Sequence, residues 1–482
     1  MTEKKTLIFL LIILAIAVFF RLWQLDSIPP GLYPDVAING NDALDSLKNG
    51  DFKVFYPENN GREGLFIWLI AASFSIFGVS IWSIKIVAAL IGTLTVLGLY
   101  LLTKELFLKW NENISRSVAL LSSFFLAISF WHTNFSRIGF RAILLPFILV
   151  FAFYFLFRGF REKKILYFVI SGLLFGLGFY TYISYRFIVI LLPLILFFFW
   201  LVYQKQNLQK QFFQFAICSL TFTILVALPI GIYFSQNPGD FIGRTAGVSI
   251  FAQQNPIMAF GESLIKHVGM FNFYGDFNWR HNFAGSPQLF WPIGILFLIG
   301  FALSIKYMKW LIAWFFVMLL PGILTYEGIP HALRVIGVIP VVYIFAGLGG
   351  WNVYQWLKQN TKRQKLLLAT VFLFLLAAGV SEFDKYFNKW GKSAEVKGAF
   401  SADYVEIGNY LNSLPKDVQK YVIVNMPGVP VPWPDGIPMP AQTIMFIEST
   451  KYGQPQATYL LPEDLEKIKI EKNAVVVKMH YE

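Results

Sequence analysis

Hydrophobic segments separated by short polar ones fill most of the chain up to residue 382. Many of them hold roughly 20 residues, the length that an α-helix needs to cross the hydrocarbon core of a bilayer. The pattern predicts a polytopic α-helical membrane protein in a lipid bilayer. We expect about eleven transmembrane helices, at residues 7–20, 80–103, 117–133, 140–157, 165–184, 187–203, 212–234, 288–305, 310–326, 332–357 and 366–382.

The apolar segment at residues 65–77 is short for a crossing, and we interpret it as re-entrant or interfacial. The positive-inside rule tests this choice. The segments that then face the cytoplasm carry seventeen basic residues: Lys4, Lys5, Lys104, Lys109, Arg116, Arg158, Arg161, Lys163, Lys164, Lys205, Lys210, Lys306, Lys309, Lys358, Lys362, Arg363 and Lys365. If residues 65–77 crossed, all but the first two would lie outside. We therefore expect a cytoplasmic N-terminus and an extracytoplasmic C-terminus.

The polar stretch at residues 26–64 is predicted to be the first outer loop. Pro29, Pro30 and Pro34 interrupt any helix that arrives from upstream. Asp35 then stands at the position of a helix N-cap, before a short surface helix over Val36–Leu47 that Asn49-Gly50 ends. Glu63 follows at the start of the next apolar segment. The loop thus places two carboxylates at helix starts beside the membrane.

From residue 383 the composition changes to that of a soluble domain. We expect a transmembrane domain at 1–382, with a large outer loop at 235–287, and a small extracytoplasmic α/β domain at 383–482. The elements expected in this second domain are a helix at 403–414, strands at 421–426, 443–447 and 474–479, and a short helix that Pro462 opens.

Composition excludes two other function classes. The chain is 56% hydrophobic and 14% charged, which rules out a soluble fold. Its net charge of +12 comes mostly from basic residues in the short cytoplasmic loops, so we predict no nucleic-acid partner. Cys218 is the one cysteine of the sequence, which excludes an intrachain disulfide and a cysteine metal cluster.

Three motifs carry a resemblance to a known family: PPGLYPD at Pro29–Asp35, NGRE at Asn60–Glu63 and FGVSIWSIK at Phe77–Lys85. Their order after an N-terminal span resembles the GT-C glycosyltransferases of the protein O-mannosyltransferase and aminoarabinose-transferase type. The likeness covers roughly the first 340 residues in layout and is specific over about residues 22–140.

The resemblance implies a polyprenyl-phosphate sugar as donor and an acidic residue of the first outer loop as catalytic base. Asp35 matches that residue, and Glu63 matches a second acidic residue later in the loop. Two positions depart from the family pattern: Val36 stands where Glu is common and Gly64 where Pro is usual. Any role that needs adjacent carboxylates is therefore in question.

Elementary chemistry fits the same function. A lipid phosphate leaves as a stable anion, so one carboxylate that accepts a proton and several cations that bind phosphate suffice. Such a single displacement inverts the anomeric carbon. Asp35 and Glu63 are the candidate catalytic residues. The candidate phosphate-binding residues on the same outer face are Arg62, Arg137, Arg141, Arg280, His281, His331 and Arg334.

Plainer interpretations stay open for several of these residues. Asp35 would also serve as a simple N-cap, Arg62 and Glu63 as a surface ion pair, and Arg137 and Arg141 as interfacial arginines. No cofactor is required. A divalent metal bound by Asp35, Glu63 and His281 is a secondary hypothesis, because no tight ligand spacing supports it.

We therefore predict a membrane glycosyltransferase that moves a sugar from a polyprenyl-phosphate donor to an acceptor hydroxyl outside the cytoplasm. Whether the acceptor is a protein, a lipid or a glycan is left open. The alternative is a transporter or flippase of lipid-linked sugars that uses the same basic face without a catalytic base.

Overall fold

The computed structural model describes residues 2–243, 245–468 and 473–480. The chain divides into two compact units. Unit 1 consists of Met1–Trp23, Ala88–Gln236 and Arg244–Trp390, and unit 2 of Gln24–Val87, Asn237–Gly243 and Gly391–Glu482. One boundary between the units, after Val87, falls within helix α4 (Ile81–Phe107).

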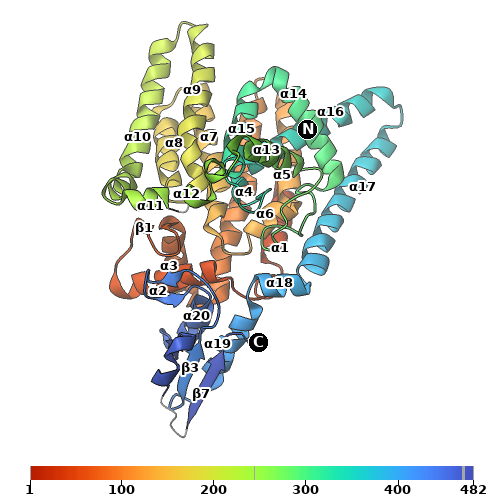
Figure 1. The fold of residues 1–482 in the computed structure, drawn as a ribbon. Helices are drawn as coiled ribbons and strands as arrows, with labels where there is room; N and C mark the ends of the chain where they lie inside the picture. The colour runs from red at the N-terminus through yellow and green to blue at the C-terminus, as the bar shows by residue number, and fades with distance from the viewer. Residues whose placement is uncertain (1, 244, 469–472, 481–482) are drawn as a thin grey trace. The chain divides into compact units, whose positions relative to one another are not determined.

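Unit 1 is helical (Figure 1). Its further helices are α1 (Glu3–Leu22), α5 (Glu112–Ile128), α6 (Phe130–Phe135), α7 (Leu144–Glu162), α8 (Ile165–Gly178), α9 (Ile188–Gln204), α10 (Gln209–Gln236), α12 (Thr245–Val248), α13 (Pro256–Gly269), α14 (Trp291–Tyr307), α15 (Lys309–Ile323), α16 (Ile339–Asn360) and α17 (Gln364–Phe383). Short 3-10 helices lie at Arg141–Ile143, Ile183–Phe187, Ile250–Ala252 and Ile336–Val338, and a π-helix at Asp384–Trp390.

Helix α16 packs against α14 and α5, and α8 against α7 and α10. Small residues allow the closest of these approaches: a Cβ on Gly349 of α16 would lie 1.9 Å from the carbonyl oxygen of Leu296 on α14. The interior holds fully buried Trp131, Trp314 and Trp390. Other helices keep large apolar side chains exposed, such as Ile224 on α10 and Phe372 on α17, at 63% and 65%. Such surfaces suit contact with lipid.

Seven helices among the described residues are long and apolar enough to cross a membrane. They are Glu3–Leu22, Ile81–Phe107, Arg141–Glu162, Ile183–Gln204, Gln209–Gln236, Ile336–Asn360 and Gln364–Trp390, and the bent pair Trp291–Lys306 and Lys309–Ile323 would make an eighth. The predicted polytopic helical fold is confirmed, whereas the count of eleven spans is not. One reason is that the segment expected at 117–133 is interrupted at Ser129, the residue between α5 and α6.

Unit 2 combines helices with short strands. Its helices are α2 (Pro34–Asn49), α3 (Leu65–Phe77), α11 (Pro238–Ile242), α18 (Ala394–Ala399), α19 (Ala402–Ser413), α20 (Ala441–Tyr452) and the 3-10 helix Pro462–Lys467. Its strands are β1 (Phe55–Tyr56), β2 (Arg62–Glu63), β3 (Gln419–Ile423), β4 (Pro430–Val431), β5 (Ile437–Pro438), β6 (Thr458–Leu460) and β7 (Ala474–Lys478).

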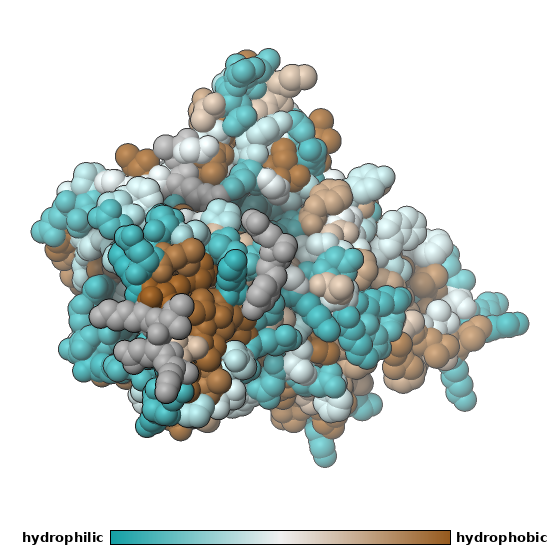
Figure 2. Space-filling view, turned by 60° about the horizontal axis from the view of Figure 1, so that its bottom comes forward, coloured by the Kyte–Doolittle hydropathy of each residue, from teal (hydrophilic) through white to brown (hydrophobic). Residues whose placement is uncertain are grey.

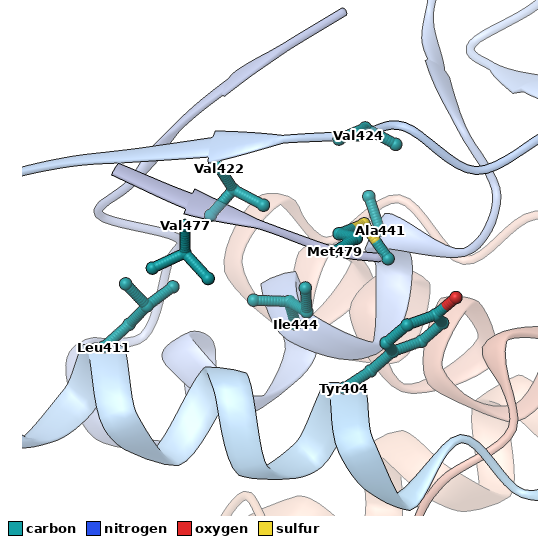
Figure 3. Packing of buried hydrophobic residues seen from close by; sticks show 8 residues of the cluster. All are labelled: Tyr404, Leu411, Val422, Val424, Ala441, Ile444, Val477 and Met479. Carbon is teal, nitrogen blue, oxygen red and sulfur yellow. The ribbon is translucent and has the colours of Figure 1, made fainter. Parts of the chain in front are cut away.

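Strand β3 is the centre of a parallel sheet of order β6-β3-β7, in which Tyr421 pairs with both Thr458 and Val476. One hydrophobic cluster fills the space between this sheet and two helices: Leu411 of α19, Val422 of β3, Ile444 of α20 and Val477 of β7 point toward one another (Figure 3). The predicted α/β character of the C-terminal region is confirmed. Hydrophobic surface lies beside hydrophilic surface on the face of the molecule that Figure 2 shows.

The strand predicted at 443–447 is wrong, because these residues lie in α20. Thr443, Ile444 and Ile447 are β-branched, which favours a strand locally. In the folded unit, however, α20 packs against both α19 and α2, and Ile444 and Ile447 are buried at helical spacing. Tertiary packing therefore overrides the local preference.

Candidate functional site

Asp35 lies in the first turn of α2 and is half-buried. The helix begins two residues earlier than the sequence suggests, because Pro34 has a backbone angle suited to the first helical position. Tyr33 is therefore the N-cap, and the prediction of Asp35 as the cap is wrong. Gly50 ends the helix in the left-handed conformation, as predicted. A carboxylate in the first turn is still stabilised by the helix dipole.

Asn59 holds the Asp35 carboxylate. Its side-chain amide donates a hydrogen bond to Asp35 Oδ1 at 3.0 Å. Asn59 and Asn60 have φ values of +54° and +62°, and Gly61 has +88°, so the turn needs residues that tolerate the left-handed region. In the described parts of the chain Asp35 forms no ion pair. Asn59 is not among the predicted site residues, although two consecutive asparagines before a glycine signal a turn of this kind.

Arg62 is 1% exposed and engaged within unit 2. Its Nη1 lies 2.5 Å from Asp42 Oδ2 and donates to Asn39 Oδ1 at 3.0 Å, while its Nε donates to the carbonyl oxygen of Glu58. Burial raises the pKa of Asp42, and the charge of Arg62 opposes that rise. Arg62 thus joins the β1–β2 hairpin to α2.

Glu63 is 3% exposed on β2, opposite Phe55 of β1. The strand leads directly to Gly64, the N-cap of α3. Glu63 therefore belongs to the framework that supports the first outer loop, and its catalytic role stays a prediction.

In unit 1, Asp276, His281 and His331 form a compact group. Asp276 Oδ2 lies 3.0 Å from His281 Nδ1 and 3.9 Å from His331 Nδ1, and the two imidazole centroids are 4.8 Å apart. The two histidines come from separate loops, which the structure brings together. The group could hold a metal ion.

This grouping differs from the predicted metal ligands. Asp35 and Glu63 belong to unit 2, whereas His281 belongs to unit 1, where its carboxylate neighbour is Asp276. Asp276 is not among the predicted ligands. The sequence feature that could have indicated this ligand is an aspartate five residues before a histidine in the polar segment GDFNWRHN.

Two further polar residues surround the group. The backbone amide of His331 donates to His267 Nε2 at 3.1 Å, and Arg334 pairs with Glu327 at 2.7 Å. Burial lowers the pKa of His267 to about 4. Burial also lowers the pKa of His331 well below its ordinary value, and the neighbouring His281 and Arg334 lower it further.

The remaining predicted arginines have different surroundings. Arg137 is fully buried, donates to the carbonyl oxygens of Phe20 and Trp23 at the end of α1, and lies 5.0 Å from the ring of Phe387. A cation at a helix C-terminus is favourable, so Arg137 stabilises the fold. Arg141, half-buried, lies 5.4 Å from the Tyr182 ring.

The backbone of Arg280 is fixed on both sides, by Asn278 and by Asn134. Asn278 Oδ1 accepts from its amide at 3.0 Å, and its carbonyl oxygen accepts from the Asn134 side chain at 2.7 Å. The backbone amide of Asn278 also donates a hydrogen bond to Asp276 Oδ1 at 2.7 Å. Hydrogen bonds within the segment from 276 to 281, and one from Asn134, therefore hold its backbone.

Known proteins support the same architecture. Residues 65–234 match the family model of the dolichyl-phosphate-mannose-protein mannosyltransferases. The structure is similar to that of ArnT from Cupriavidus metallidurans bound to undecaprenyl phosphate, with a TM-score of 0.55 and 14% identity over 97% of this chain and 91% of that one. The fold is that of the GT-C glycosyltransferases.

A second GT-C structure is also similar to this one. The archaeal oligosaccharyltransferase AglB from Archaeoglobus fulgidus, in complex with an inhibitory peptide and a dolichol-phosphate, matches with a TM-score of 0.55 and 14% identity over 95% of this chain. The chain spans 65% of that protein's length. No curated protein matches the sequence. The predicted resemblance to GT-C enzymes is confirmed.

Proposed function

We propose that this chain is an integral membrane glycosyltransferase that moves a sugar from a polyprenyl-phosphate donor to an acceptor hydroxyl on the extracytoplasmic face. One observation carries the proposal: the chain shares its fold, over 97% of its length, with a protein whose structure holds undecaprenyl phosphate. The mannosyltransferase family match over residues 65–234 supports it independently of that fold.

Asp35 is the proposed general base. The acceptor oxygen attacks the anomeric carbon, and its proton passes to the Asp35 carboxylate. The bond from the anomeric carbon to the phosphate oxygen breaks, and its electron pair leaves with polyprenyl phosphate. The Asn59 hydrogen bond to Oδ1 orients the carboxylate for this role. With one displacement, the anomeric configuration inverts.

The donor phosphate is assigned to Arg141, Arg280 and Arg334. Arg62 and Arg137 are themselves buried and already engaged by Asp42 and by backbone carbonyl oxygens, so we assign them to the framework. Arg334 pairs with Glu327, which is 45% exposed. Such ion pairs contribute about 0 to 1 kcal/mol, so a phosphate can replace Glu327 at small cost. We group His281 and His331 with Asp276, and Glu63 with the loop framework.

We infer the orientation of the chain in the membrane from the distribution of its basic residues. The N-terminus lies in the cytoplasm, and both the first outer loop and the C-terminal domain at 383–482 lie outside it. This places Asp35 on the side where the positive-inside rule allows few Lys and Arg residues.

Turnover of a synthetic donor tests the proposal. Purified protein is given a short-chain polyprenyl-phosphate sugar and an extract of the cell envelope as acceptor, and released polyprenyl phosphate is measured. Asp35→Asn keeps the size of the side chain and should lower turnover by roughly 10² to 10⁴. The matched control is Asp45→Asn, an exposed position on the same helix, which should leave turnover unchanged.

Two results would contradict the proposal. Near-normal turnover in Asp35→Asn would remove Asp35 from the mechanism. Movement of the intact donor across proteoliposome membranes without release of polyprenyl phosphate would instead favour the transporter or flippase alternative, because transport needs no base.

A further inference from the structure

We propose that Asp276, His281 and His331 bind a divalent transition-metal ion, with Zn²⁺ as the best fit, and that this ion joins two outer loops of unit 1. The inference does not depend on the proposed glycosyltransferase activity. It rests on the positions of three donor atoms, on one buried imidazole nitrogen, and on the contacts that hold the carboxylate.

The donor atoms have separations that suit a metal ion. All three lie within 4.8 Å of one another. Zn–N and Zn–O bonds of about 2.0 to 2.2 Å require donors roughly 3.3 Å apart in a tetrahedral site. The 3.0 Å and 3.9 Å separations from Asp276 Oδ2 to the two histidines lie on either side of this value. Small side-chain adjustments would therefore complete the site.

A buried imidazole nitrogen of His331 also supports a metal site. Its Nδ1 is buried and has no hydrogen-bond partner among the residues that the structure describes. At 3.9 Å from Asp276 Oδ2, it is too far for a hydrogen bond. A buried polar nitrogen without a partner is costly, so such groups call for an explanation. A metal ion between His331, Asp276 and His281 supplies the missing partner.

The carboxylate is held from outside the group. The amide of Asn278 donates to Asp276 Oδ1 at 2.7 Å, and the amide of Ala332 donates to Oδ2 at 2.7 Å. Contacts of this kind orient the ligands of metal sites. The Ala332 contact also shows that the loop carrying His331 reaches Asp276 directly. The ion would reinforce a junction that already exists.

The donor chemistry favours Zn²⁺. Two imidazole nitrogens and one carboxylate oxygen are ligands that Zn²⁺ accepts, and three protein ligands leave a fourth position for water or another oxygen. Ca²⁺ and Mg²⁺ prefer six or more oxygen ligands or several waters, and two imidazoles fit them poorly. The plain alternative is a hydrogen-bonded Asp276–His281 pair on which His331 simply stacks.

The metal content of the purified protein distinguishes a metal site from a simple hydrogen-bonded Asp276–His281 pair. The full chain, purified without a histidine tag, is freed of metal with a chelator, dialysed against Zn²⁺ and analysed by inductively coupled plasma mass spectrometry. We expect about one zinc per chain. His331→Ala and His281→Ala should each lose most of it, while His480→Ala, which removes an exposed histidine in unit 2, should keep it.

A second measurement needs no variant and so does not depend on how the variants fold. Co²⁺ replaces Zn²⁺ in such sites, and tetrahedral or five-coordinate Co²⁺ absorbs visible light much more strongly than hydrated Co²⁺. We expect this absorption in the wild-type chain and its loss on addition of Zn²⁺. Less than about a tenth of a zinc per chain, the same zinc content in His331→Ala and in the wild type, or no such Co²⁺ absorption would each overturn the proposal.

Discussion

Asn59 Nδ2 lies 3.0 Å from Asp35 Oδ1 and donates a hydrogen bond to it. One partner is in the first turn of α2, and the other is in the left-handed turn that precedes β2. The contact orients the carboxylate that the proposed mechanism needs as base. In the proposed mechanism Asn59 is therefore a positioning residue, which acts through Asp35.

Replacing Asn59 should reduce turnover less than replacing Asp35. A hydrogen bond to a charged group contributes about 1.5 to 3 kcal/mol, so Asn59→Ala should lower kcat by roughly 10- to 150-fold. The KM for the donor should stay close to that of the wild type, since Asn59 is not assigned to the phosphate. Steady-state kinetics with the synthetic donor checks this. Unchanged kcat would separate Asn59 from the mechanism.

Loss of Arg62 should destabilise unit 2. Arg62→Ala would leave the Asp42 carboxylate without its partner, and breaking a buried ion pair costs about 3 to 5 kcal/mol. Tm in detergent should fall, and Lys53→Ala, at an exposed surface pair, should leave it nearly unchanged. In the double variant Arg62→Leu/Asp42→Leu, much of the lost stability should return. A Tm for Arg62→Ala equal to that of wild type would show that the pair does not support the fold.

Donor binding should depend on Arg280 and Arg334. A charge-assisted contact to phosphate contributes roughly 1.5 to 3 kcal/mol, so each Arg→Ala variant should bind a short-chain polyprenyl-phosphate sugar about 10- to 150-fold more weakly. Asp35→Asn should bind it nearly as well as wild type, because the proposed base is assigned to the acceptor's proton and not to the phosphate. Calorimetry on all three variants tests the assignment. Equal affinities would refute the phosphate site.

Single cysteines should report the proposed orientation. In a Cys218→Ser background, cysteines at the exposed positions Asp51 and Gln454 should react with an impermeant thiol reagent added to intact cells, and one at exposed Gln206 should not. Labelling of Gln206 from outside would mean that residues 65–77 cross the membrane. Permeabilised cells provide the control, because all three positions should then react.

The sequence alone determined the class of the protein and much of its local structure. The hydrophobic segments predicted a polytopic helical membrane protein, because the thickness of a bilayer fixes the length of a spanning helix. The expected helix at Val36–Leu47 agrees with α2 to within two residues at each end, since proline and glycine act through their own backbone angles. The spacing of apolar residues predicted the helix at 403–414 and the strand at 474–479, which correspond to α19 and β7.

Only the tertiary structure decided which side chains meet. The sequence placed Arg62 and Arg137 among the phosphate ligands, but Asp42 and two backbone carbonyl groups engage them. It placed His281 with Asp35 and Glu63, but a second loop brings His331 to the neighbouring Asp276. The physical reason is that periodicity and turn chemistry act over a few residues. Contacts between distant segments depend instead on how the helices pack, which no local pattern encodes.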